Sequence, residues 1–445
     1  MRNSSFYSAL ARSIVTGDAA LELIVARASR TLGRNWPWLR PLARRYLKAF
    51  GPESRPKRRE VVAFLIADAG MKAVLHRYGS SIRIAEWLNE SAKMTPVRVA
   101  RKWAIPAIES AGALAEWLQV SAVELEWFAD LKRLATRLGS EQIEGPLSHY
   151  HYRILAKEGG NIRLIEAPKQ RLKAIQKKIL VDILDHIPLH PAAHGFRKSC
   201  SIRSFAAPHV GQSVVVRMDL HDFFPSVRGG RVQAMFRMAG YPEPVATLLG
   251  GLCTNAAPRN LWTTRSAGLD PLKVSDARSL YACAHLPQGA PGSPALANIC
   301  AYRVDCRLTG LAESAGAVYT RYADDLGFSG GKEFERGVER FVIRAAAILM
   351  EEGFTVHHRK TRIMRRGVRQ YLAGLVTNDR INVVREDFDR LKATLTNCVR
   401  HGAESQNYDG HAAFRLHLEG RVGFVETVNP AKGVRLRRIL EKIRW

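Results

Sequence analysis

The clearest alternation of apolar and polar positions lies near the middle of the chain. A β-branched apolar run begins at Val214 and ends on Asp219, as expected for a strand buried on both faces. Residues 318–329 read as strand, tight turn and strand, with Asp324 and Asp325 at the turn. We therefore predict an α+β fold in which a strand end and a hairpin turn bring three carboxylates together.

Other patterns place elements around this region. Residues 1–140 are predicted to form a helical N-terminal extension, since apolar residues recur there at helical spacing. Residues 152–168 predict a β-hairpin whose turn lies at residues 158–161. Residues 253–285 contain several Pro and Gly residues and are predicted to be a loop-like surface insertion. Two helices are predicted near the C-terminus, over residues 384–401 and 412–428.

The carboxylates suggest metal chemistry. Two adjacent anionic side chains repel each other, and burying them without a partner is costly. Asp is also common in ordinary turns, so Asp324 and Asp325 alone leave both interpretations open. Asp219 favours a two-metal phosphoryl-transfer site, because Mg²⁺ prefers a few carboxylates together with substrate phosphates. Residues 286–298 form a Pro/Gly-rich turn that opens into a helix, which is suited to holding a nucleotide.

Charge indicates a polyanionic partner. The 445 residues include 68 Lys+Arg against 41 Asp+Glu, a net charge of +27. This excess favours nucleic acid over a membrane surface as the partner. No apolar run approaches the length of a membrane span, and Arg12 interrupts the only apolar stretch near the N-terminus. We therefore expect a cytoplasmic protein with no membrane partner.

Three segments, in this order, closely resemble the palm of reverse transcriptases. Asp219 matches the first aspartate of that family, Gln288 and Gly289 match its Pro-Gln-Gly turn, and residues 322–325 match its Tyr-X-Asp-Asp box. The resemblance implies a right-hand polymerase with fingers and palm over residues 148–385, an antiparallel palm sheet, and a helical thumb over residues 386–445. It also implies two Mg²⁺ ions, with Mn²⁺ as an alternative, held by Asp219, Asp324 and Asp325.

The same resemblance implies roles for further residues. Lys360 matches the lysine that protonates departing pyrophosphate, although simple phosphate attraction is an equal alternative. Phe224 resembles the ring that excludes a ribose hydroxyl, which implies deoxynucleotide substrates. The implied nucleotide-binding residues are Arg163, Lys169, Phe224, Gln288 and Gly289, and the implied nucleic-acid-binding residues are Arg197, His209, Arg362, Arg365 and Gly374.

Within the reverse transcriptases, the retron branch is the one that the chain resembles, with two departures. Phe205 stands where retron enzymes carry an asparagine, and Leu372-Ala373 replace the Val-Thr that precedes Gly374. His209 keeps the histidine of that segment, but a satisfied core histidine is equally compatible. The two departures affect positions associated with recognition of the partner RNA.

Three functional hypotheses follow. The first is a retron-type RNA-directed DNA polymerase that copies a structured noncoding RNA, serving as template and primer, into DNA in anti-phage defence. Its partners would be dNTPs, an RNA–DNA hybrid, and a toxin or effector protein. The second is a non-retron defence-associated reverse transcriptase with different priming. The third is a catalytically idle RNA-binding scaffold, which the three intact carboxylates disfavour.

Overall fold

The chain folds into two compact units. The computed structural model describes residues 2–52, 56, 58–79, 81–86, 93–133, 148–157, 161–266 and 268–445. One unit comprises residues 1–95 with 108–113, and the other comprises residues 96–107 with 114–445. Residues 158–160 of the hairpin turn predicted at 158–161, and the boundary predicted near residue 140, lie outside the described residues. No helix in the described ranges is long and apolar enough to cross a membrane.

The first unit is helical and has its own core. Its elements are α1 (Arg2–Val15), α2 (Leu21–Thr31), α3 (Leu39–Phe50), α4 (Arg58–Ala67) and α5 (Ala69–Tyr78). Apolar residues at helical spacing, such as Leu10, Leu42 and Tyr46, are fully buried in this core. Asp68 caps α5 by accepting from Met71 N at 2.8 Å, and the Arg45 guanidinium on α3 donates two hydrogen bonds to the same carboxylate.

The second unit combines many helices with antiparallel strands. Its first elements are η1 (Ala100–Lys102), α6 (Ala111–Leu118, shared with the first unit), α7 (Ala122–Ala129), β1 (Tyr150–Ala156), β2 (Ile162–Pro168), α9 (Gln170–Asp182), η2 (Leu184–His186), α10 (Ile202–Ala206), η3 (Ala207–His209), β3 (Val214–His221), α11 (Phe223–Ser226), α12 (Gly229–Met238), α13 (Glu243–Cys253), α14 (Leu261–Thr264), α15 (Pro271–Tyr281), α16 (Ser293–Cys300) and α17 (Tyr302–Ser314). The remaining elements are β4 (Ala317–Tyr322), β5 (Asp325–Gly330), α18 (Lys332–Glu351), β6 (Thr355–Val356), η4 (His358–Lys360), β7 (Arg362–Arg365), β8 (Tyr371–Leu372), β9 (Leu375–Val376), β10 (Asn382–Val383), α19 (Arg385–His401), η5 (Glu404–Gln406), α20 (Phe414–Val428) and α21 (Pro430–Leu440).

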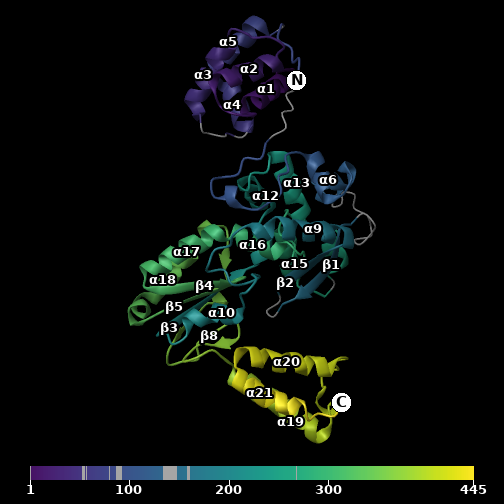
Figure 1. Cartoon of the computed structure of the whole chain (residues 1–445), viewed down its shortest axis with the longest axis vertical. Helices are drawn as coiled ribbons and strands as arrows, with labels where there is room; N and C mark the ends of the chain where they lie inside the picture. Colours follow the sequence, from purple (N-terminus) through teal and green to yellow (C-terminus); the bar gives the residue numbers. More distant parts are fainter. Residues whose placement is uncertain are drawn as a thin grey trace. The chain divides into compact units, whose positions relative to one another are not determined.

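A five-stranded antiparallel sheet forms the centre of this unit. Its order is β4-β5-β3-β6, and β7 also pairs with β3. The β-branched run from Val214 to Val216 is fully buried, as its continuous apolar pattern predicts. Helices α17 and α18 lie along the sheet (Figure 1), and Phe341 of α18 packs edge-on against Phe328 of β5. The structure thus confirms the α+β prediction in its coarse form, with helices packed against antiparallel sheets.

The C-terminal helices share a core with the other face of the sheet. Helices α19, α20 and α21 pack together (Figure 1), and Leu391, Leu418 and Leu436 are buried among them. The same apolar cluster continues to Val215 on β3 and to Phe205 on α10. The predicted helices over residues 384–401 and 412–428 are present, at Arg385–His401 and Phe414–Val428, and α21 follows them.

The segment predicted as a loop-like insertion is instead partly helical. Residues 253–285 contain α14 and α15. Trp262 and Tyr281 from these helices are buried, and their rings stack with 5.9 Å between the centroids. The segment also contacts the β1–β2 hairpin, because Leu164 N donates to the Tyr281 hydroxyl at 3.3 Å and Arg265 donates to Tyr152 O at 2.7 Å. The Pro and Gly residues mark the ends of short helices here.

Candidate active site

The register of the central strands brings the three predicted carboxylates together. In the β3–β5 pairing Asp219 lies directly opposite Asp325, and in the β4–β5 pairing Tyr322 lies opposite the same residue. Leu220 N donates to Asp324 O at 2.9 Å, which holds the hairpin turn beside the end of β3. Residues far apart in the sequence therefore meet because antiparallel register aligns one strand end with one turn.

A fully buried ion pair braces the turn that carries the carboxylates. Arg321 on β4 donates two hydrogen bonds to Asp305 on α17, at 2.8 and 2.7 Å, and neither side chain is exposed. The same guanidinium donates to Asn298 Oδ1 at 2.9 Å and to Ala323 O at 3.1 Å. Ala323 has φ +55°, a left-handed conformation that a non-glycine residue adopts only at a cost. The Arg321 contact helps to stabilise this strained residue.

Gly195 packs closely against the same turn. A Cβ atom at Gly195 would lie 2.5 Å from Ala323 N, so only glycine allows this approach. His194 N donates to Arg321 O and Arg321 N donates to Ala192 O, both at 2.7 Å. Residues 192–195, just before the predicted nucleic-acid contact Arg197, therefore run along the edge of β4, where they support the turn.

Electrostatic repulsion and burial both act on the carboxylates of the turn. Burial raises the pKa of Asp324, and the nearby charges of Asp325 and Asp219 raise this pKa further. Burial also raises the pKa of Asp325, although the Arg217 guanidinium, which donates to this carboxylate at 2.8 Å, opposes the rise in pKa. Lys360 Nζ contacts Asp219 at 3.1 Å. Three carboxylates thus share two cationic partners.

This balance of charge decides how well the site suits metal ions. Within the described ranges, no group of three or more His, Cys, Asp or Glu side chains is arranged to hold a metal ion. Asp219 and Asp325 are instead paired with Lys360 and Arg217. The carboxylate oxygens fit the ligand preference of Mg²⁺, and the excess negative charge favours an added cation. Lys360 contacts both oxygens of Asp219, at 3.1 and 3.4 Å, whereas the contacts of Arg217 with Asp325 are to Oδ1. A metal ion at Asp219 would therefore compete with Lys360.

A second charged group lies next to the end of β3. Asp222, in a left-handed conformation with φ +47°, accepts from Lys157 Nζ at 3.2 Å and contacts His221 Nδ1 at 2.6 Å. Burial raises the pKa of Asp222, but these two partners outweigh it and lower the pKa. The Phe224 ring is half-buried and contacts the rings of Phe196 and Phe223, at 6.1 and 5.6 Å between centroids. Phe224 lies on α11, which begins directly after β3 and Asp222.

The predicted nucleotide-binding residues lie on two adjoining elements. Arg163 is exposed on β2, and Lys169 is the N-cap residue of α9, directly after that strand. Gln288 O accepts from Glu166 N of β2 at 2.9 Å, and a Cβ at Gly289 would lie 2.9 Å from Glu166 O. The Pro-Gln-Gly turn and the hairpin are therefore packed backbone to backbone.

His209 and Phe205 lie inside the protein. His209 is fully buried, with its ring nitrogens 2.6 Å from Ser329 Oγ and 2.7 Å from Thr320 Oγ1, and burial lowers its pKa to about 3. The predicted contact with nucleic acid does not fit this placement, whereas the alternative of a satisfied core histidine does. Phe205 is also fully buried and contacts the ring of Tyr322 at 6.0 Å. The departure at position 205 therefore fills the core beneath the Tyr-X-Asp-Asp box.

The other predicted nucleic-acid contacts are at the surface. Arg197 and Arg362 are exposed, and Arg365 is exposed but contacts Glu335 and Glu339 of α18 at 3.4 Å. Gly374 has φ +79° in the tight turn between β8 and β9, directly after the replaced pair Leu372-Ala373, of which Leu372 is fully buried. These residues occupy three separate elements.

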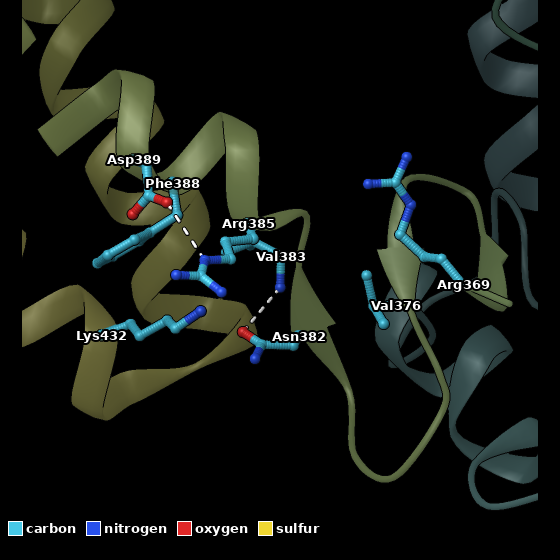
Figure 2. A pocket seen from close by; sticks show the side chains of 8 residues that line it. All are labelled: Arg369, Val376, Asn382, Val383, Arg385, Phe388, Asp389 and Lys432. Atoms are coloured by element: carbon cyan, nitrogen blue, oxygen red, sulfur yellow. Dashed lines mark hydrogen bonds and ion pairs between the residues drawn. The ribbon is translucent and has the colours of Figure 1, made fainter. Parts of the chain in front are cut away.

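A separate pocket of about 380 Å³ lies at the base of the C-terminal helices. Figure 2 shows Arg385 and Lys432 on one side of this pocket and Arg369 with Val376 on the other. Arg369 pairs with Glu386 at 2.7 Å, and Arg385 pairs with Asp389 at 3.5 Å. None of the three carboxylates of the candidate active site lines it.

Sequence reasoning missed several residues that organise the site. Arg321 and Arg217 lie within β-strand patterns, where a charged residue reads as solvent-facing. Their alternation with apolar neighbours was visible, but the partners Asp305 and Asp325 are set by tertiary packing. Gly195 lies two residues before Arg197, a predicted nucleic-acid contact, and its close approach to Ala323 explains the need for glycine.

Comparisons with known proteins define the class. A family model described as reverse transcriptase (RNA-dependent DNA polymerase) matches residues 155–376, which include the three carboxylates and the Pro-Gln-Gly turn. The telomerase of Candida tropicalis, solved with a fragment of telomeric RNA, has 10% identity and a TM-score of 0.30 over 62% of this chain and 54% of its own. That structural likeness is too low to carry an argument.

Sequence relatives narrow the class. The retron Mx65 reverse transcriptase of Myxococcus xanthus is 40% identical over 65% of this chain, and the retron Mx162 reverse transcriptase of the same organism is 36% identical over 75%. The matches span 64% and 67% of those two proteins. The retron Ec86 reverse transcriptase of Escherichia coli is 29% identical over 69% of this chain and 87% of its own. The chain belongs to the retron reverse transcriptase family, which confirms the resemblance found in the sequence.

Proposed function

We propose that this protein is an RNA-directed DNA polymerase that copies a partner noncoding RNA into DNA. The observation that carries the proposal is the convergence of Asp219, Asp324 and Asp325 at one end of the central sheet. Membership of the retron reverse transcriptase family supports the same activity. The net charge of +27 supports a nucleic-acid partner, since a basic protein releases counterions when it binds phosphates.

The residues of the site take distinct parts in this proposal. Two Mg²⁺ ions held by the three carboxylates would activate the primer hydroxyl and stabilise the departing pyrophosphate. Arg163 and Lys169 would bind the incoming triphosphate, and the backbone at Gln288 and Gly289 would form the adjoining wall of the nucleotide site. The Phe224 ring would exclude a ribose hydroxyl and so select deoxynucleotides.

Lys360 has two parts to play in the same proposal. Its ammonium group pairs with the carboxylate of Asp219, at 3.1 Å. Once released, the side chain can reach a departing pyrophosphate, because it is 56% exposed and begins from the short η4 helix beside the site. Lys360 would then donate the proton that the leaving group needs.

The partner RNA and biological role extend the proposal. The named relatives are retron enzymes, so we propose a structured noncoding RNA as template and primer, and a role in anti-phage defence together with an effector protein. Arg197, Arg362 and Arg365 are exposed and would contact the RNA or the RNA–DNA hybrid through backbone phosphates. Gly374, at the tip of its turn, would approach the primer end closely.

Primer extension tests the polymerase activity. Wild type and Asp324→Ala are each given an RNA template annealed to a DNA primer, dNTPs and Mg²⁺. We expect wild type to incorporate dNTPs and Asp324→Ala to lose about 100-fold or more of this rate, since it lacks one of three metal-holding carboxylates. Asp276→Ala, which removes an exposed carboxylate on α15, is the matched control and should keep the wild-type rate. Equal rates for wild type and Asp324→Ala would reject the assigned site.

A further inference from the structure

A buried polar network lies behind the Pro-Gln-Gly turn. Glu166 on β2 is fully buried, and each oxygen of its carboxylate has a partner. Oε1 accepts from Asn255 Nδ2 at 2.8 Å, and Oε2 lies 2.8 Å from His285 Nε2. Asn255 Nδ2 also donates to the hydroxyl of Tyr152 on β1 at 3.1 Å. The β1–β2 hairpin, the end of α13 and the segment before the turn are thus joined through one carboxylate.

The hydrogen-bond directions around His285 show that this link is charged or shares a proton. His285 Nδ1 lies 2.8 Å from Cys283 O, a carbonyl that only accepts, so Nδ1 carries a proton. Nε2 faces the Glu166 carboxylate, so one further proton lies between Nε2 and Oε2. Both side chains are completely buried, and removing one partner of such a pair is strongly destabilising because it leaves the other without compensation.

Backbone contacts extend the link to the predicted nucleotide site. Asn255 and His285 exchange two backbone hydrogen bonds, at 3.0 and 2.9 Å, and Leu286 N donates to Val227 O at 3.1 Å. Three residues beyond His285, Gln288 O accepts from Glu166 N at 2.9 Å. Residue 166 therefore holds the turn twice, once through its backbone and once through its side chain.

We propose that Glu166, with His285 and Asn255, is a positioning residue that fixes how the Pro-Gln-Gly turn meets β2 at the nucleotide site. Two adjoining walls of that site would be β2, which carries Arg163, and the turn at Gln288 and Gly289. The network would hold one wall against the other from behind, without a contact to the nucleotide. This inference rests on the proposed polymerase function and adds residues that neither the sequence patterns nor the family resemblance indicated.

Steady-state kinetics on an RNA template with a DNA primer, at varied dNTP concentration, test the proposal. Glu166→Ala should raise KM for dNTP by about 10-fold while kcat changes by less than about 3-fold, because a loosened wall weakens nucleotide placement. Glu166→Gln should restore KM to within about 2-fold of wild type. Its amide can accept from Asn255 and donate to a neutral His285 Nε2, so it keeps the link without the charge.

A milder variant guards against loss of folding. Asn255→Ala removes one donor at a half-buried position and should raise KM about 3-fold in the same direction. The matched control is Gln176→Leu on α9, which removes a buried side chain that donates to Tyr150 and Leu252 but does not touch the turn. It should lower the melting temperature and leave KM unchanged.

The outcomes separate the two proposals. An inactive wild type would remove the polymerase function itself. An active wild type with unchanged KM in Asn255→Ala and in folded Glu166→Ala would overturn the positioning role alone. The same holds if Gln176→Leu raises KM as much as Asn255→Ala does, since KM would then follow stability and not the link.

Discussion

The β4–β5 hairpin carries polar groups in two contrasting settings. At its tip, Asp324 and Asp325 are partly exposed and, with Asp219, outnumber their cationic partners. Away from the tip, Arg321 is fully buried, and so is His209, which contacts Thr320 of β4. The polar side-chain atoms of both residues have partners inside the protein. One group of polar side chains at this hairpin is therefore unbalanced in charge, and the other is satisfied by partners inside the protein.

This difference separates the residues that can bind a ligand from those that support the fold. A buried charge with a complete set of partners is fixed in place and has nothing left to offer a ligand. A carboxylate whose pKa is raised by burial and by its neighbours gains from an added cation. Charge balance and exposure, and not the residue type alone, therefore distinguish the candidate active site from its support.

The largest expected effect comes from breaking the buried ion pair between Arg321 and Asp305. Arg321→Met leaves Asp305 buried without its partner, and we expect the free energy of unfolding to fall by about 3–5 kcal/mol. Urea denaturation followed by circular dichroism measures the change. The double variant Arg321→Met with Asp305→Leu removes both charges and should recover most of the loss. If single and double variants were equally unstable, the cost would come from packing and not from the uncompensated charge.

The buried histidine predicts a pH dependence of intermediate size. The pKa of His209 is about 3 in the folded protein against 6.5 for an ordinary histidine, so the unfolded chain takes up a proton first as pH falls. Its contribution to stability is complete above pH 6.5 and is lost as pH falls towards 3. Between pH 6.5 and 4, the free energy of unfolding of the wild type should fall by about 2–3 kcal/mol more than that of His209→Gln. If the free energy of unfolding changed with pH in the same way for both proteins, His209 would be accessible to protons in the folded state.

The smallest expected change is an increase in stability, and it concerns the tip of the β4–β5 hairpin. Asp324→Asn removes a charge that its neighbours repel, so the free energy of unfolding should rise by about 0.5–1 kcal/mol while nucleotide incorporation is lost. Thermal denaturation beside the primer-extension assay measures both. Asp305→Asn is the contrasting variant and should be destabilising. A tip variant that is less stable than wild type would show that the carboxylates support the fold.

Local patterns were enough to predict much of the fold. The strand predicted to end on Asp219 follows from its continuous apolar run, and in the structure it extends to His221. The hairpin at residues 318–329 and the helix positions near the C-terminus follow from periodicities of two and about 3.6 residues. The short helices α14 and α15 were missed because Pro and Gly dominate their ends, and local pattern does not show that Trp262 and Tyr281 are buried.

The sequence by itself determined which residues can do chemistry: the three carboxylates, the Pro-Gln-Gly turn and the basic excess are visible in the order of the chain. Only the tertiary structure decided which charges are paired. Arg321 meets Asp305, Glu166 meets His285, and His209 turns inward to Thr320 and Ser329. Such partners are distant along the chain, and their pairing depends on strand register and burial, which no local pattern encodes.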